Sequence, residues 1–144
     1  MTSRIQISDH APDGYRKVVQ LDSYVNGTLE STLVNLVYLR ASLINGCTYC
    51  VDSHSVDLAA EVDVRKVYSV TTWRESEWFT PRERAALDLT ESITRIEHGV
   101  SDGVWQAASA QFSEKELADL VLAIGTINVW NRIAIPTGML PPAL

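Results

Sequence analysis

The stretch Arg40–His54, RASLINGCTYCVDSH, decides how the rest of the chain is interpreted. It holds the two cysteines of the sequence, Cys47 and Cys50, three positions apart, and His54 follows four positions later. In a helix that begins near Cys47, residues three and four positions apart lie on one face, so both sulfurs and the imidazole would share it. The Asn-Gly pair directly before is a turn signal, which places Cys47 in the first helical turn.

Two thiols beside a proton carrier are typical of a dithiol redox centre, which cycles between dithiol and disulfide. The unpaired N–H groups and the positive dipole end at a helix N-terminus favour a thiolate at Cys47. His54, as a base or a cationic partner, favours the thiolate form of Cys50 instead. The residues alone therefore indicate the chemistry and leave open which sulfur is the nucleophile.

Three other interpretations of the cysteines compete with the redox centre. They can be small buried apolar residues beside an unrelated histidine. The spacing C-x2-C-x3-H offers three zinc ligands, but a structural zinc site uses four, and His10 and His98 are distant in sequence. A disulfide that closes so short a loop removes little entropy from the unfolded chain, so a purely structural bridge is disfavoured. We therefore expect a redox centre with no metal and no cofactor.

The run LVNLVYLRASLINGCTYCVDSHSVDLAAE, residues 33–61, resembles the core of the alkylhydroperoxidase D-like (AhpD-like) group in the carboxymuconolactone decarboxylase superfamily. The later runs WFTPRERAALDLTESIT and INVWNRIAI also resemble that group, so the resemblance covers residues 21–135. It implies an all-helical fold, an oligomeric assembly and peroxide reduction through the cysteine pair. In that group the second cysteine attacks the peroxide and the first resolves it, which assigns these roles to Cys50 and Cys47.

The chain departs from this group at position 35. Peroxidase members carry a glutamate twelve positions before the first cysteine, which relays protons with the histidine, and this chain has Asn35 there. An amide can hydrogen-bond and orient a neighbour, but it cannot accept and return a proton at neutral pH. Asp57, three positions after His54, can orient the imidazole, although a solvated helix carboxylate is the alternative. Asn35 and Asp57 are therefore candidate supporting residues.

Composition bounds the class of protein. A chain of 144 residues suits one domain spanning residues 1–144, and 46% hydrophobic with 21% charged residues is ordinary for a globular protein. The formal net charge of −6 argues against nucleic acid or an anionic membrane as a partner. We find no export signal and no apolar run that would span a bilayer, so we expect a cytoplasmic protein, where such a cysteine pair can cycle.

Helical periodicity and capping signals predict an all-α, single-domain bundle of about seven helices, as in AhpD-like proteins. The expected helices cover residues 12–27, 28–43, 47–60, a short segment capped by Asp63, 80–98, 101–112, and a last one that begins after Ser113 and ends before Pro136. Residues 1–11 are expected to form an extended arm. In the loop 71–80, Trp73, Trp78 and Phe79 are interpreted as a lid on the core, or else as the wall of a substrate pocket or an intersubunit contact.

The favoured function is a small thiol-dependent peroxidase or disulfide reductase with peroxiredoxin-type, antioxidant activity. Its partners would be a hydroperoxide substrate, an external dithiol reductant (a thioredoxin-like or lipoyl protein), and further copies of the chain in a dimer, trimer or hexamer. Two alternatives remain. One is a noncatalytic or redox-sensing oligomeric member, which Asn35 favours. The other is a decarboxylase-type member of the superfamily, although such members lack the cysteine pair.

Overall fold

The computed structural model describes residues 3–144, which form eight α-helices and two short 3-10 helices, with no strand in that range. Their bounds are α1 (Ile7–His10), α2 (Pro12–Thr28), α3 (Ser31–Asn45), α4 (Thr48–Ala59), α5 (Val64–Tyr68), η1 (Ser69–Glu75), α6 (Pro81–Thr94), η2 (Ile96–His98), α7 (Asp102–Gln111) and α8 (Glu114–Thr137). The all-α prediction is confirmed, and the helix beyond the expected seven is the short α1.

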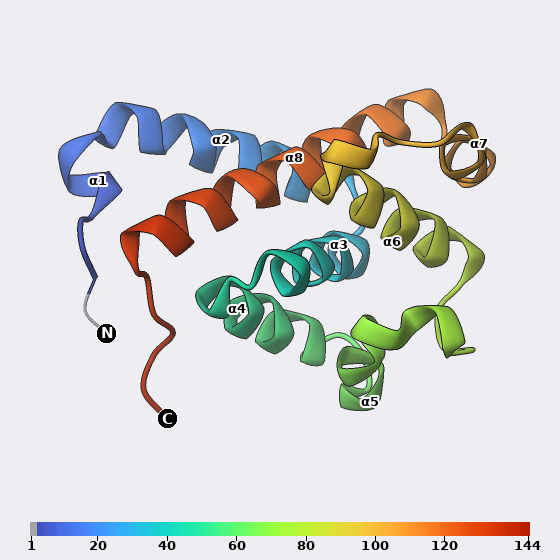
Figure 1. Ribbon diagram of the computed structural model, residues 1–144, viewed down its shortest axis with the longest axis horizontal. Coiled ribbons are helices and arrows are strands. Elements are labelled where there is room, and N and C mark those ends of the chain that lie inside the picture. Colours follow the sequence, from blue (N-terminus) through green and yellow to red (C-terminus); the bar gives the residue numbers. More distant parts are fainter. Residues whose placement is uncertain (1–2) are drawn as a thin grey trace.

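Helix α3 lies at the centre of the bundle and packs against α4, α6 and α8, while α2 and α8 run side by side (Figure 1). Every residue from 33 to 39 is buried, so the helix is enclosed on all sides. Val34 and Val37 pack into a core shared with α2, α6 and α8. Leu36 and Leu39 face a second cluster, formed with α4, η1 and α6. Because α3 is held on all sides, the turn at its C-terminal end is held in place too.

Several predicted helix starts are confirmed by their caps. The Thr80 and Ser113 hydroxyls each accept a backbone N–H three residues on, and the glutamate at that position bonds back to complete a capping box. Ser101 and Asp63 cap α7 and α5 in the predicted way. The predicted cap at Thr28 is wrong, because its hydroxyl donates back to the carbonyl of Val25 at 3.3 Å within α2.

Both ends of the chain differ from the expectation. The predicted arm contains α1, and the Arg4 N–H donates to the Thr137 carbonyl at 2.7 Å, which ties the arm to the end of α8. Met1 and Thr2, the first part of that predicted arm, lie outside the described residues. Helix α8 continues through Pro136 to Thr137 instead of ending before it. At the last turn a proline costs the helix only one backbone hydrogen bond, and Gly138 then ends it with a φ of 72°.

Helix α8 is, by length and composition alone, apolar enough to cross a membrane, and 44% of its most apolar window is buried inside the bundle. Its buried residues include Leu120, Ile124 and Ile127, which belong to the core around α3. The core helix of a globular bundle satisfies the same length and hydropathy criteria, and packing against α2, α3 and α6 accounts for its apolar sequence.

The aromatic residues before α6 form a lid, as predicted, for two of the three positions. Trp73 and Phe79 are buried against Leu36, Leu39 and neighbouring residues of the second cluster. The Trp73 indole N–H donates to a Glu91 carboxylate oxygen at 2.9 Å, which satisfies its one polar group. Trp78 is half exposed, and the guanidinium of Arg65 lies over its ring.

Gly46 makes the turn that joins α3 to α4. Its φ of 74° and ψ of 33° lie in the left-handed region, which glycine adopts without the steric penalty of a Cβ. Both the Gly46 and the Cys47 N–H groups point back to the carbonyl of Ser42, the latter at 3.0 Å. The predicted Asn-Gly turn is therefore confirmed, and it sets where the next helix begins.

We expect Gly46→Ala to lower the free energy of unfolding by about 1 kcal/mol, because alanine must adopt the left-handed conformation. A Cβ at Gly46 would meet nothing within 4 Å, so the cost would be conformational. The matched control is Gly125→Ala in α8, where a Cβ also meets nothing within 4 Å. There the helix propensity of alanine should raise the stability by up to about 1 kcal/mol. Urea denaturation measures both variants, and effects of the same sign would contradict the expectation.

Candidate active site

The two cysteines lie at the N-terminus of α4 and form a disulfide, with their Cα atoms 5.3 Å apart. Cys47 is the N-cap residue, and its sulfur accepts a hydrogen bond from the Cys50 N–H at 3.3 Å. Cys47 therefore lies one position outside the helical turn in which the sequence placed it, and Cys50 lies inside that turn. The covalent bond joins the two residues as a dithiol redox centre requires.

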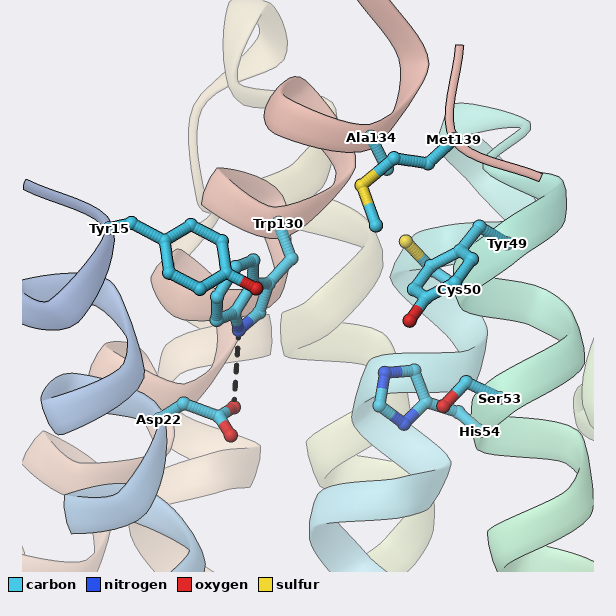
Figure 2. A pocket seen from close by; sticks show the side chains of 9 residues that line it. All are labelled: Tyr15, Asp22, Tyr49, Cys50, Ser53, His54, Trp130, Ala134 and Met139. Carbon is cyan, nitrogen blue, oxygen red and sulfur yellow. Dashed lines mark hydrogen bonds between the residues drawn. The ribbon is translucent and has the colours of Figure 1, made fainter. Parts of the chain in front are cut away.

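A cavity of about 180 Å³ opens beside Cys50, between α2, α4, α8 and the segment that follows α8 (Figure 2). Its wall is lined by Tyr15, Asp22, Tyr49, Cys50, Ser53, His54, Trp130, Ala134 and Met139. Among the described residues, Cys50 contributes to this wall and Cys47 does not. Both cysteines are buried, and Cys47 is bonded to Cys50 from outside this wall. A small molecule in the cavity would meet one sulfur of the pair.

His54 lies one helical turn beyond Cys50 and lines the same cavity, so α4 brings these two side chains together as the spacing predicted (Figure 2). Its ring packs edge to face against Tyr38, with centroids 4.9 Å apart. Among the residues from 3 to 144, no group hydrogen-bonds its Nδ1, although this atom is buried. A histidine that lines a cavity and has an unpaired buried nitrogen is a candidate for catalysis.

Burial lowers the pKa of His54 below its ordinary value of 6.5, because a charged imidazolium is poorly solvated there. The negative charges of Asp57 and Asp22 act in the opposite direction, and burial outweighs them. At neutral pH the imidazole is therefore uncharged, which is the form that can accept a proton from a thiol.

Within residues 3–144, neither candidate supporting residue forms a hydrogen bond with the His54 side chain. The Asn35 amide donates to a Glu61 carboxylate oxygen at 2.7 Å, and the Ser31 and Thr32 hydroxyls donate to the same carboxylate. Asn35 therefore belongs to a polar cluster where α3 begins and α4 has just ended, away from the described cavity wall.

Asp57 is exposed, and no hydrogen bond joins it to His54 within the described part of the chain. Its influence on the imidazole is that of a nearby negative charge.

The sequence interpretation missed Asp22, which lines the cavity from α2. Its Oδ1 accepts hydrogen bonds from the Tyr38 hydroxyl at 2.7 Å and from the Trp130 indole at 3.3 Å. Burial, and then the hydrogen bond to Asp22, raise the pKa of Tyr38, so this hydroxyl stays a donor. Helical spacing from Tyr15 to Val25 puts Asp22 on the apolar, inward face of α2. A carboxylate on such a face was the signal that could have found it.

A chain of polar side chains fixes the turn before the cysteines to α8. The Asn45 amide donates to the Asn131 and Asn128 side-chain oxygens at 2.8 and 3.0 Å. Asn131 in turn donates to the Ser42 hydroxyl at 3.0 Å. Because Trp130 is next to Asn131, this network sets the N-terminus of α4 against the tryptophan wall of the cavity.

In residues 3–144, no group of three or more His, Cys, Asp or Glu side chains is placed to hold a metal ion. Both sulfurs of the C-x2-C-x3-H motif are bonded to each other.

An all-α bundle that carries a cysteine pair and a histidine at the start of one helix is a helical protein with a dithiol–disulfide site. The chain belongs to the carboxymuconolactone decarboxylase family, whose model matches residues 12–92. The matched segment contains Asp22, both cysteines and His54.

Two similar proteins cover nearly the whole chain. The uncharacterized protein YdfG of Bacillus subtilis (strain 168) is 33% identical over an alignment of 141 residues, which covers 96% of each chain. A crystal structure from Agrobacterium tumefaciens matches with a TM-score of 0.94 and 34% identity, covering 99% of this chain and 100% of that one. It is described as a protein of unknown function and assigned provisionally as the antioxidant defence protein AhpD. The resemblance to AhpD-like proteins is confirmed.

A more distant structure shares the fold alone. The debrominase Bmp8 matches with a TM-score of 0.85 at 18% identity, covering 94% of this chain and 74% of that one. The structure of a Bmp8 variant is also known in complex with 2,3,4-tribromopyrrole. The bundle therefore serves more than one chemistry, and function has to be argued from the site.

Proposed function

We propose that this protein is a thiol-dependent peroxidase, an oxidoreductase that reduces hydroperoxides through the Cys47–Cys50 pair. One observation carries the proposal: Cys50 and His54 face a single cavity, and the disulfide partner Cys47 is buried behind them. A peroxide in that cavity meets the sulfur that has a base one turn away. We therefore assign the attack to Cys50 and the resolving step to Cys47, against the helix-dipole argument for Cys47.

The chemistry begins from the reduced dithiol. His54 takes the proton of the Cys50 thiol, and the thiolate attacks the terminal oxygen of the hydroperoxide. The O–O bond breaks, the alkoxide leaves as the alcohol after taking the proton from His54, and Cys50 becomes a sulfenic acid. The Cys47 sulfur then attacks the Cys50 sulfur, so that a disulfide forms and water leaves. Two exchange steps with an external dithiol restore both thiols and oxidise that dithiol.

The position of the disulfide bears on the external reductant. Cys50 is 3% exposed and Cys47 1% exposed, so an attacking thiolate has to enter through the cavity beside Tyr49. The slender dithiol arm of a lipoyl protein fits such an opening more readily than the surface of a thioredoxin-like domain. We propose a lipoyl-type reductant and, because the pair must be re-reduced, a location in the reducing cytoplasm.

We also propose that the chain assembles with copies of itself. Large apolar side chains are exposed on several elements of the single chain, among them Val56 on α4 (63% exposed), Tyr68 on α5 (74%) and Ile96 in η2 (63%). A contiguous apolar patch on the surface marks an interaction face, and these side chains are the candidates to contribute to one. The dimer, trimer and hexamer remain the candidate assemblies.

The test counts thiols in the reduced protein before and after one equivalent of cumene hydroperoxide or hydrogen peroxide. We expect both thiols to disappear, and peroxide to be consumed repeatedly when lipoamide and its reductase are supplied. Two thiols that stay free after peroxide would defeat the peroxidase proposal. Oxidation without turnover by any dithiol would support the redox-sensing alternative. A decarboxylase-type activity would survive replacement of both cysteines by serine.

A further inference from the structure

The side chain of Asp22 faces His54 from the opposite wall of the cavity (Figure 2). Tyr38 and Trp130 both donate to its Oδ1, and these two bonds hold that oxygen in place. Within residues 3–144, no group donates a hydrogen bond to Oδ2. One oxygen is thus held by the protein, while the other is left for a ligand. A fixed acceptor of this kind is preorganised, because it needs no rearrangement when the ligand arrives.

We infer that Asp22 is the residue that positions the substrate, accepting the O–H of a hydroperoxide so that its terminal oxygen is presented to Cys50. The inference rests on the proposed function. A hydroperoxide R–O–OH has one donor, and that hydrogen sits on the oxygen that the thiolate attacks. When Asp22 accepts this hydrogen bond, the reacting oxygen lies between α2 and α4, and the other oxygen is left for the protonated His54. The attack, the O–O cleavage and the proton transfer are those of the proposed peroxidase reaction.

The remaining wall suits the organic part of such a substrate. Tyr15 and Trp130 present aromatic surface, with ring centroids 5.4 Å apart, and Ala134 and Met139 complete an apolar side. A cavity of about 180 Å³ holds a small organic group beside the O–OH. The expected substrates are therefore organic hydroperoxides, which carry a donor. Dialkyl peroxides, which lack the O–H, should bind poorly.

The charges around the site separate this role from activation of the thiol. In the described part of the chain, the titratable side chains that share the cavity wall with His54 are Tyr15 and Asp22 from α2 and Tyr49 and Cys50 from α4. Tyr38 of α3 packs against the imidazole ring, Asp57 acts on it as a nearby charge, and the wall residues from α8, Trp130 and Ala134, carry no charge. A carboxylate across the cavity favours the imidazolium and disfavours the thiolate. Removing its charge should therefore not slow the reaction of Cys50 with a reagent that has no O–H donor.

The experiment compares reduced wild type with Asp22→Asn in two single-turnover reactions of Cys50, one with cumene hydroperoxide and one with iodoacetamide. Asparagine keeps an oxygen for Tyr38 and Trp130 and replaces the free acceptor by a donor. We expect the peroxide rate to fall about ten- to a hundredfold, the cost of one hydrogen bond to a charged group. The iodoacetamide rate should stay within about threefold, or rise.

The matched control is Asp119→Asn. Asp119 also accepts a tyrosine hydroxyl, that of Tyr24 at 2.8 Å, and also joins α8 to α2, but it lies outside the described cavity wall. Its peroxide rate should stay within about threefold of wild type. Asp22→Glu, which keeps the charge and the acceptor, should recover part of the rate that Asp22→Asn loses.

An unchanged peroxide rate in Asp22→Asn would overturn the inference and leave the proposed function standing. Equal losses in both reactions would also overturn it, because Asp22 would then act on the thiol or on the fold. Wild type that fails to react with peroxide at all would defeat the proposed function, and the inference with it.

Discussion

Cys50→Ser is expected to abolish peroxide reduction, lowering the rate of peroxide consumption by at least about a thousandfold, because it removes the nucleophile. Cys47→Ser should keep the first reaction and lose the second. This variant should consume one molecule of peroxide per chain, after which Cys50 stays as a sulfenic acid. The reason is positional: the Cys50 sulfur lies on the cavity wall, and the Cys47 sulfur lies behind it.

The measurement is peroxide consumption per chain for each variant, with a dimedone-type reagent and mass spectrometry to locate the sulfenic acid. The label should appear on Cys50 in Cys47→Ser and be absent from Cys50→Ser. The reverse pattern, with Cys50→Ser reacting once and Cys47→Ser inert, would mean that the helix dipole selects the nucleophile. The two variants are controls for each other, because each breaks the same disulfide.

The parts of the site that lie on one helix could be predicted from the sequence, because helical spacing fixes them. Cys50 and His54 are four positions apart on α4 and share a wall for that reason. The capping boxes before α6 and α8 are equally local, since each is formed within four consecutive residues. Asp22 comes from another helix, and its place opposite His54 depends on how α2 and α8 pack together. No spacing within α2 determines that.

The supporting role expected for Asn35 could not be predicted from sequence distance either, because it depends on how two helices face each other. Helices α3 and α4 are joined by the turn at Gly46, so residues at similar distances from that turn meet. Tyr38 and His54 are each eight positions from Gly46, and their rings are in contact. Asn35 lies nearly a full turn further along α3 and reaches Glu61 instead. The residue facing the imidazole from α3 is therefore an aromatic one, and a carboxylate reaches the cavity from α2.

The extension of α8 through Pro136 has a comparable cause. A proline inside a helical pattern predicts that the helix ends before it. In the last turn, however, a proline removes only one backbone hydrogen bond. The arm at residues 3–5 supplies a further stabilising contact that the local sequence does not show, because the Arg4 guanidinium donates to the Pro136 carbonyl at 3.1 Å. Met139 follows directly and closes one end of the cavity.

His54→Gln is expected to lower the rate of peroxide reduction at neutral pH by about a hundredfold, the usual contribution of a general base. Wild type should show an acid limb in its pH–rate profile, with a midpoint below 6.5, because burial lowers the pKa of His54. The variant should lack that limb. The control is His98→Gln, since the His98 side chain is 77% exposed and lies beside Glu97 in η2. Its profile should match wild type.

The lowered pKa of His54 also predicts a pH dependence of stability. In the unfolded chain the imidazole takes up a proton at its ordinary pKa of 6.5, while in the folded protein it does so only at lower pH. Between these two values the unfolded state binds more protons, so the free energy of unfolding falls as the pH falls. Urea denaturation at pH 7 and pH 5 should show a larger loss of stability in wild type than in His54→Gln. An equal loss in the two proteins would mean that folding does not lower the pKa of His54. An acid limb retained by the variant would mean that another group produces it and that His54 is not the base.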